Sequence, residues 1–177
     1  MPRITDLKAR LFRVPLPEVM SDAKHGEHTH FELVTVEVTT EDGLAGTGYT
    51  YTGGKGGRAI LAMVVHDLKD WLLGQDAGGV EALNEAMLWR LHYVGRGGIA
   101  SFAISAIDIA LWDLRGRREG LPLWRMAGGA SSRSRAYRGA IDLNFPLEKL
   151  LTNVQGFIDE GYKAVKIKVG QPDMRDD

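Results

Sequence analysis

Apolar and polar residues alternate along the first fifty residues in the pattern of β-strands. Residues 31–40, FELVTVEVTT, place three valines on one face and polar side chains on the other. The sequence EDG at residues 41–43 is typical of a hairpin turn, and residues 44–51 return as the partner strand. Residues 4–14 form a further predicted strand, which a turn at PLPEVM (15–20) would end. The pattern predicts three antiparallel strands.

The period then changes to that of helices. Apolar residues recur every three or four positions in residues 57–73 and 80–93, which predicts two amphipathic helices. Residues 99–120, IASFAISAIDIALWDLRGRREG, are apolar on almost every side, which predicts a buried helix with a small-residue face for close packing. We expect its Asp108 and Asp113 to be structural, held by hydrogen bonds or by an arginine.

The composition changes again at residues 120–135, GLPLWRMAGGASSRSR, where Gly, Ser and Arg cluster, and this predicts a domain boundary. Beyond it, the pattern predicts a strand at 135–139, a helix at 146–160 and a strand at 164–169. A strand, a helix and a strand at this spacing form a parallel βαβ unit. An α/β domain therefore begins in the last quarter of the chain.

The composition narrows the class of protein. The chain has 177 residues, of which 44% are hydrophobic and 25% charged, an ordinary globular balance. Twenty-two Lys and Arg oppose 23 Asp and Glu, so the net charge of −1 gives no support to nucleic-acid or membrane binding. The sequence has no cysteine for a disulfide or a thiolate metal site. With no signal-like segment and no run of about 20 apolar residues, we expect a cytoplasmic protein.

Two lysines share one face of the last predicted strand. In residues 161–170, GYKAVKIKVG, Lys166 and Lys168 lie opposite the valines and the isoleucine. A lysine is protonated at neutral pH, but a second ammonium group nearby and burial both disfavour the charged form. Such a pair can therefore supply a neutral amine that acts as a base. The alternative is a solvent-facing strand whose lysines extend their charged ends into water.

Two stretches of the sequence resemble the enolase superfamily, in its mandelate racemase/muconate lactonizing enzyme subgroup. Residues 103–129 resemble the helix signature of this family, and residues 161–170 resemble its Lys-x-Lys strand. The resemblance implies an α+β capping domain, a three-stranded antiparallel sheet plus helices, at residues 1–130. It also implies that residues 131–177 are the first βαβ of a modified TIM (β/α) barrel, which is incomplete in this chain.

The resemblance implies an enzyme that removes the proton next to a carboxylate, while Mg²⁺ stabilises the enediolate. Lys168 would be the base, and Lys166 would lower the pKa of Lys168 and contact the substrate carboxylate. The Mg²⁺ ligands of the family and the opposing acid/base would lie beyond Asp177, so we expect no metal ligand here and no activity from this chain alone. We expect a sugar-acid dehydratase or racemase that forms homo-oligomers, with dehydration favoured.

Residues 22–30, DAKHGEHTH, resemble the mobile loop that closes the active site in this family. The resemblance implies that Lys24, His25 and His28 contact an anionic, hydroxyl-rich substrate. The run of His25, His28 and His30 is also compatible with a zinc or nickel site. A polar surface loop is the third reading.

Residues 46–58, GTGYTYTGGKGGR, form a glycine-rich connection between a strand and a helix. Neither the phosphate-binding nor the dinucleotide-binding spacing is present. The glycines are therefore interpreted as a flexible connector. By resemblance this loop reaches over the mouth of the barrel, which makes Tyr49 and Tyr51 candidates for substrate contact.

A function of a different class is also compatible with the sequence. The chain could be a non-catalytic folding or oligomerisation module that lacks the metal site. It would associate with like chains through its helices and through the open edge of its second barrel strand, because an unpaired strand edge promotes association.

Overall fold

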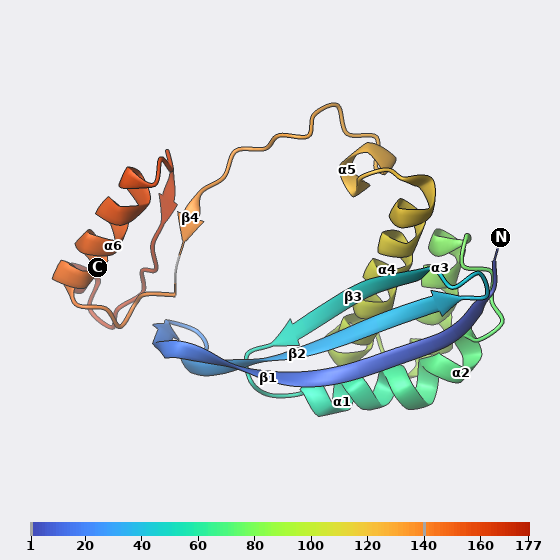
Figure 1. The fold of residues 1–177 in the computed structure, drawn as a ribbon. Helices are drawn as coiled ribbons and strands as arrows, with labels where there is room; N and C mark the ends of the chain where they lie inside the picture. The colour runs from blue at the N-terminus through green and yellow to red at the C-terminus, as the bar shows by residue number, and fades with distance from the viewer. Residues whose placement is uncertain (1, 140) are drawn as a thin grey trace. The chain divides into compact units, whose positions relative to one another are not determined.

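The computed structural model describes residues 2–139 and 141–177 (Figure 1). The contacts within the chain form two units, which comprise residues 1–14 with 31–132, and residues 15–30 with 133–177. A long β-hairpin therefore has its base in the first unit, whereas its tip, residues 15–30, belongs to the second.

Three strands form a sheet in the order β1-β2-β3 (Figure 1). Their bounds are Ile4–Asp22 for β1, Gly26–Thr40 for β2 and Ala45–Thr52 for β3. β2 and β3 are antiparallel, with Val36 opposite Gly48. The alternation of residues 31–40 is confirmed, because their three valines are completely buried.

The predicted turn at PLPEVM is wrong. β1 continues through this segment, and the chain reverses at residues 23–25 instead, so β1 and β2 are both longer than predicted. Pro15 and Pro17 are compatible with the strand because β1 is at the edge of the sheet, where a missing N–H group leaves no neighbouring strand unsatisfied.

The helices of the first unit follow the sheet, and Figure 1 shows them gathered on one of its faces. The predicted helices at 57–73, 80–93 and 99–120 are confirmed, with a π-helical segment inside the first and a 3₁₀ turn after the second. Their bounds are α1 Gly57–Ala62, the π-helical segment Met63–Leu68, α2 Lys69–Leu72, α3 Val80–Arg90, the 3₁₀ turn His92–Val94, α4 Gly98–Glu119 and α5 Leu123–Met126.

The small-residue face of α4 packs directly against β3. A Cβ added to Gly46 would lie 2.2 Å from the carbonyl oxygen of Ala110, and one added to Gly48 would lie 2.1 Å from that of Ala106. Both alanines are completely buried. The predicted close approach is therefore confirmed, and it requires glycine on the strand.

The hydrophobic core lies between the sheet and these helices. Its large side chains that are at most 1% exposed come from β1, β2, the 57–72 helical stretch, α3 and α4. They include Ile4, Leu7, Val34, Val36, Val38, Ile60, Val64, Leu68, Leu72, Val80, Met87, Ile107, Leu111 and Leu114. Within the described residues, no helix combines the length and the apolar composition needed to cross a lipid bilayer.

The second unit contains the hairpin tip and a parallel βαβ arrangement. Its elements are β4 Arg138–Gly139, α6 Leu147–Asp159, β5 Val165–Lys166 and a 3₁₀ turn Met174–Asp176. β4 and β5 are parallel, as predicted, but each is only two residues long. Among the described residues, β4 and β5 form a sheet of two strands, so each strand has one edge without a hydrogen-bonded neighbour.

The second unit buries little apolar surface. Among its described residues the buried side chains are His28 and Asp142, and neither is hydrophobic. The apolar stripe of α6 is open, with Leu147 69% and Leu151 58% exposed. Ile167, just after β5, is 43% exposed. This unit therefore presents an apolar surface of the kind that neighbouring strands and helices cover in a barrel.

Candidate active site of the second unit

Lys166 and Lys168 line the same cavity in the second unit. Lys166 lies in β5 opposite Gly139 of β4, and Lys168 follows two residues later. The cavity has a volume of about 680 Å³, and its lining consists of Met20, Tyr137, Arg138, Gly139, Ile141, Phe157, Lys166 and Lys168. Lys166 is exposed and Lys168 is half-buried. Both lysines thus line one space, which we call the lysine cavity.

Asp142 holds the chain where regular strand pairing has ended. Its Oδ1 accepts a hydrogen bond of 2.9 Å from the backbone N–H of Lys168, and its carbonyl oxygen accepts one of 2.9 Å from the N–H of Phe145. Its side chain is only 5% exposed. The sequence analysis missed this residue, because a single aspartate after a short strand belongs to no periodic pattern.

The hairpin tip is attached to the loop that precedes α6. Asn144 accepts a hydrogen bond of 2.9 Å from the N–H of Ser21 through its Oδ1, and its Nδ2 donates one of 3.0 Å to the carbonyl oxygen of Val19. An ion pair between Lys149 of α6 and Glu18 adds a further connection. The tip is therefore held against this loop by polar contacts of both backbone and side chains.

Asp22 lies at the turn of the hairpin tip and gathers two histidines. Its Oδ1 accepts hydrogen bonds from the backbone N–H groups of Lys24 (2.9 Å) and His25 (2.7 Å). The Nδ1 of His25 lies 3.1 Å from its Oδ2, and the Nε2 of His28 lies 3.4 Å from the same oxygen. The backbone N–H of His25, more than any other contact, holds the pKa of Asp22 well below its usual range.

The reading of His25, His28 and His30 as one group of metal ligands does not match the structure, which leaves His30 outside the group. The Nδ1 of His30 lies 3.0 Å from the hydroxyl oxygen of Thr29, whereas Asp22 completes the group with His25 and His28. Strand geometry explains the difference, because Asp22 ends β1 and lies across the turn from the start of β2. A motif search confined to histidine spacing cannot find an aspartate from the opposite strand.

Tyr49 and Tyr51 belong to the first unit. They lie on the face of β3 opposite Gly46 and Gly48 and are 54% and 57% exposed. The ring of Tyr51 packs edge-to-face against Phe31, with 5.8 Å between the ring centroids. Both tyrosines are therefore accessible, and their contact with substrate stays a prediction.

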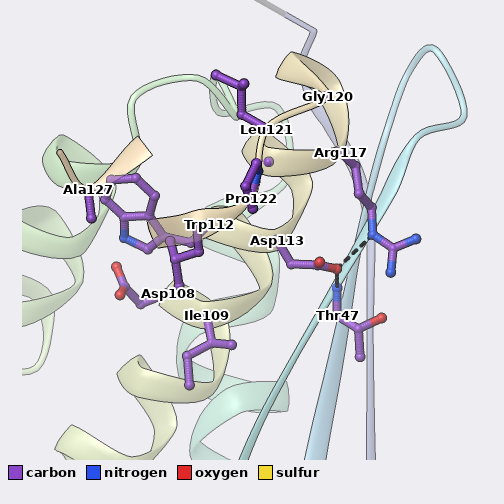
Figure 2. A pocket seen from close by; sticks show the side chains of 12 residues that line it. Thr47, Asp108, Ile109, Trp112, Asp113, Arg117, Gly120, Leu121, Pro122 and Ala127 are labelled. Carbon is purple, nitrogen blue, oxygen red and sulfur yellow. Dashed lines mark hydrogen bonds and ion pairs between the residues drawn. The ribbon is translucent and has the colours of Figure 1, made fainter. Parts of the chain in front are cut away.

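The first unit has its own cavity of about 710 Å³ beside α4 and α5 (Figure 2). Asp113 accepts hydrogen bonds of 2.8 Å from the backbone N–H of Thr47 and of 2.8 Å from the Nε of Arg117. Asp108 instead accepts a hydrogen bond of 2.9 Å from the Nδ2 of Asn84, and burial raises its pKa. Both aspartates thus have the partners that structural residues need.

The potential metal ligands among the described residues do not suit magnesium. Within residues 2–139 and 141–177, a single group of three or more potential metal ligands has its donor atoms within 4.8 Å of one another, namely Asp22, His25 and His28. Mg²⁺ prefers six oxygen ligands in an octahedron, and two imidazole nitrogens do not meet this preference. The magnesium chemistry implied by the resemblance therefore finds no fitting donor set among these residues.

The chain is similar over almost its whole length to sugar-acid enzymes. It is 47% identical over 174 residues to 3,6-anhydro-alpha-L-galactonate cycloisomerase of Streptomyces coelicolor, and this match covers 98% of the chain and 48% of the relative. It is 35% identical over 181 residues to L-talarate/galactarate dehydratase of Salmonella typhimurium, with 99% and 45% covered. The chain thus spans about half the length of the curated relatives it matches.

Solved structures give the same result. A racemase from Streptomyces coelicolor with bound magnesium has a TM-score of 0.94 and 47% identity, and the match covers 97% of this chain and 48% of that one. The L-talarate/galactarate dehydratase of Salmonella typhimurium, liganded with Mg and L-lyxarohydroxamate, has a TM-score of 0.92 and 35% identity, with 99% and 46% covered. The fold predicted from the resemblance is therefore confirmed.

A family model assigns the larger part of the chain. Residues 5–128 match the N-terminal domain of mandelate racemase / muconate lactonizing enzyme. This match includes the helix signature up to residue 128, and it extends over β1, β2, β3 and the helices packed on them. The chain therefore belongs to the mandelate racemase / muconate lactonizing enzyme family.

Proposed function

We propose that this chain carries the catalytic pair of lysines, one of them the proton-abstracting base, of a lyase or isomerase that acts on sugar acids. The observation that carries the proposal is the lysine cavity, in which two amines from one strand end face the same space. Relatives that match 98% and 99% of the chain are named as a cycloisomerase and a dehydratase of sugar acids, which supports this substrate class. The cytoplasm remains the predicted location.

In this proposal Lys168 is the base and Lys166 binds the substrate. The half-buried Lys168 accepts the proton from the carbon next to the carboxylate, and the electron pair of the C–H bond moves into the carboxylate to form an enediolate. The exposed ammonium group of Lys166 binds a carboxylate oxygen by a charge-assisted hydrogen bond. Asp142 positions Lys168 through its backbone N–H. To complete a dehydration, the enediolate would expel the β-hydroxide, and a general acid would protonate it to water. To complete a racemisation, the opposing acid/base would return a proton to the other face of the carbon.

The hairpin tip and the exposed tyrosines complete the proposed substrate contacts. Lys24 and His25 are exposed on the tip, which the polar contacts of Asn144 hold near the loop before α6. Positive and hydrogen-bonding side chains there suit a polyhydroxylated anion. We assign the same role to His28 and, from the capping domain, to Tyr49 and Tyr51.

We also propose that residues 1–130 are the capping domain and that residues 131–177 open the barrel. The open apolar surface of α6 and of the segment after β5 supports this, because further barrel elements would cover it. Magnesium would then be bound by residues other than the described residues of this chain. The opposing acid/base would also be one of those other residues. Association of like chains is part of the proposal.

The second candidate, a non-catalytic folding or oligomerisation module, is favoured by the same open apolar surface. Its discriminating property is self-association without turnover. Size-exclusion chromatography with light scattering would measure the mass of the particle that residues 1–177 form. A mass that is a multiple of the 19.5 kDa of one chain would show self-association.

The experiment that tests the enzyme proposal measures exchange of the α-proton with solvent deuterium by NMR. The protein that carries this chain, with any residues that follow Asp177 in its gene, is incubated with Mg²⁺ and a panel of aldonic and aldaric acids. We expect exchange or dehydration with at least one acid, and none with residues 1–177 alone. Failure of the gene product on the whole panel, in both readouts, would favour the module.

A further inference from the structure

We propose that Asp22, His25 and His28 form a binding site for a transition-metal ion of the Zn²⁺ class at the turn of the hairpin tip. The site uses two histidines that the proposed function assigns to substrate contact, but its nitrogen donors differ from the oxygen ligands that magnesium prefers, and its test does not depend on enzyme activity. Asp22 comes from the end of β1, His25 from the turn and His28 from the start of β2.

The distances from the Asp22 carboxylate to the two imidazole nitrogens fit a tetrahedral metal ion. Ligands bound to zinc at 2.0–2.1 Å in a tetrahedron lie about 3.3 Å from one another. The Oδ2 of Asp22 lies 3.1 Å from the Nδ1 of His25 and 3.4 Å from the Nε2 of His28. All three donor atoms lie within 4.8 Å of one another, so a small adjustment of one ring would complete the geometry.

The turn orients the carboxylate for this role. The Oδ1 of Asp22 accepts hydrogen bonds from the backbone N–H groups of Lys24 and His25, which fixes the carboxylate between the two rings. The Nδ1 of His25 lies 3.1 Å from both carboxylate oxygens, and the Nε2 of His28 lies nearest to Oδ2. Outer hydrogen bonds of this kind fix metal ligands in place and raise affinity. Gly26 follows with a φ of +70°, a left-handed conformation that glycine adopts without strain and that closes the turn.

The site is sheltered on one side and accessible on the other. The side chains of His28 and Asp22 are 9% and 12% exposed, whereas that of His25 is 69% exposed. An ion can therefore reach the site past His25 and be bound against two largely buried donors. The backbone N–H of Ser21, next to Asp22, donates a hydrogen bond to the Oδ1 of Asn144, and this contact fixes the end of β1.

The donor set selects the kind of metal. Two imidazole nitrogens and one carboxylate oxygen suit Zn²⁺, Co²⁺ or Ni²⁺ and disfavour Mg²⁺ and Ca²⁺. Three protein ligands leave a fourth tetrahedral position for water or for an anionic group. The bound ion would join the end of β1 to the start of β2 and make the turn rigid.

The test is a Zn²⁺ titration of the chelator-treated chain by calorimetry, with Co²⁺ absorption as the spectroscopic readout. We expect one saturable site per chain and the visible bands of tetrahedral Co²⁺. His25→Gln should lower the Zn²⁺ affinity by a factor of at least about 10 and remove these bands. His30→Gln is the matched control, because it removes a histidine of the same segment outside the group, and it should leave both readouts unchanged.

Amide hydrogen exchange provides the second readout. Zn²⁺ should slow exchange at residues 22–28 in the unmodified chain and in His30→Gln, but not in His25→Gln. Because His25 is largely exposed, its replacement should leave the far-ultraviolet circular dichroism unchanged. Equal Zn²⁺ affinity in His25→Gln and His30→Gln, or no saturable binding, would overturn the proposal and leave an ion-paired cluster without metal.

Discussion

At the scale of single residues, two carboxylates organise the second unit: Asp142 accepts the backbone N–H of Lys168, and Asp22 lies close to the rings of His25 and His28. Lys166 and Lys168 could be assigned to one face because strand alternation is a local property. Asp142 and Asp22 could not be found in this way, because their roles depend on backbone N–H groups and rings brought close by folding. The sequence thus shows which residues share a face, but not which carboxylate will hold a loop.

Asp42, at the turn between β2 and β3, gives a pH-dependent test at this scale. It accepts hydrogen bonds of 2.7 Å from Arg118 and of 2.7 Å from the hydroxyl of Thr40, and that of Arg118 is the main cause of a pKa well below the usual range. Because the folded pKa is lower than the unfolded one, the stabilisation is complete above about pH 4 and is lost as the pH falls toward the folded value.

Asp42→Asn should therefore lower the melting temperature at neutral pH, and the difference from the unmodified chain should shrink as the pH falls below about 4. Thermal unfolding, monitored by circular dichroism at each pH, measures this difference in melting temperature. Glu41→Gln, which removes a neighbouring exposed charge, is the control and should show a smaller difference at neutral pH. A difference for Asp42→Asn that stays constant into the acid range would contradict the assignment.

At the scale of elements, periodicity predicted the type of each helix and strand better than its ends. The turn at residues 15–20 was predicted from two prolines, which are equally compatible with an edge strand. Neighbouring strands decide between these alternatives, and they are not visible in a local window. The parallel βαβ order was predictable from the spacing, whereas the short pairing of β4 with β5 depends on their partners.

The contact between β3 and α4 makes a prediction about Gly48. Gly48→Ala would place a methyl group 2.1 Å from the carbonyl oxygen of Ala106 and 2.5 Å from the backbone nitrogen of Ala110, so the helix would have to move. We expect a loss of about 2 kcal/mol or more in the free energy of unfolding, measured by denaturant titration.

Gly79→Ala is the matched control for this substitution. Gly79 precedes α3 with a φ of −86°, and an added Cβ would meet no atom closer than 3.8 Å outside its chain neighbours. Its replacement should cost less than about 1 kcal/mol. Similar losses for the two variants would mean that β3 and α4 are not packed as closely as described.

At the scale of the whole molecule, the sequence predicted an α+β portion followed by the start of an α/β portion, and similarity to known enzymes confirms this architecture. The assignment of residues 15–30 to the second unit was not predictable, because it rests on contacts with segments more than 100 residues away, such as that of Ser21 with Asn144. The proposed chemistry depends on both lysines of one cavity, on Asp142, which holds the backbone of Lys168, and on the polar groups of the hairpin tip.

Removal of the α-proton by Lys168 is tested by the rate of substrate α-proton exchange in D₂O for the gene product that carries Lys168→Met. We expect exchange to disappear in this variant. We expect it to persist in Lys163→Met, which removes a nearby lysine outside the lysine cavity. Unchanged exchange in Lys168→Met would show that the base is another residue.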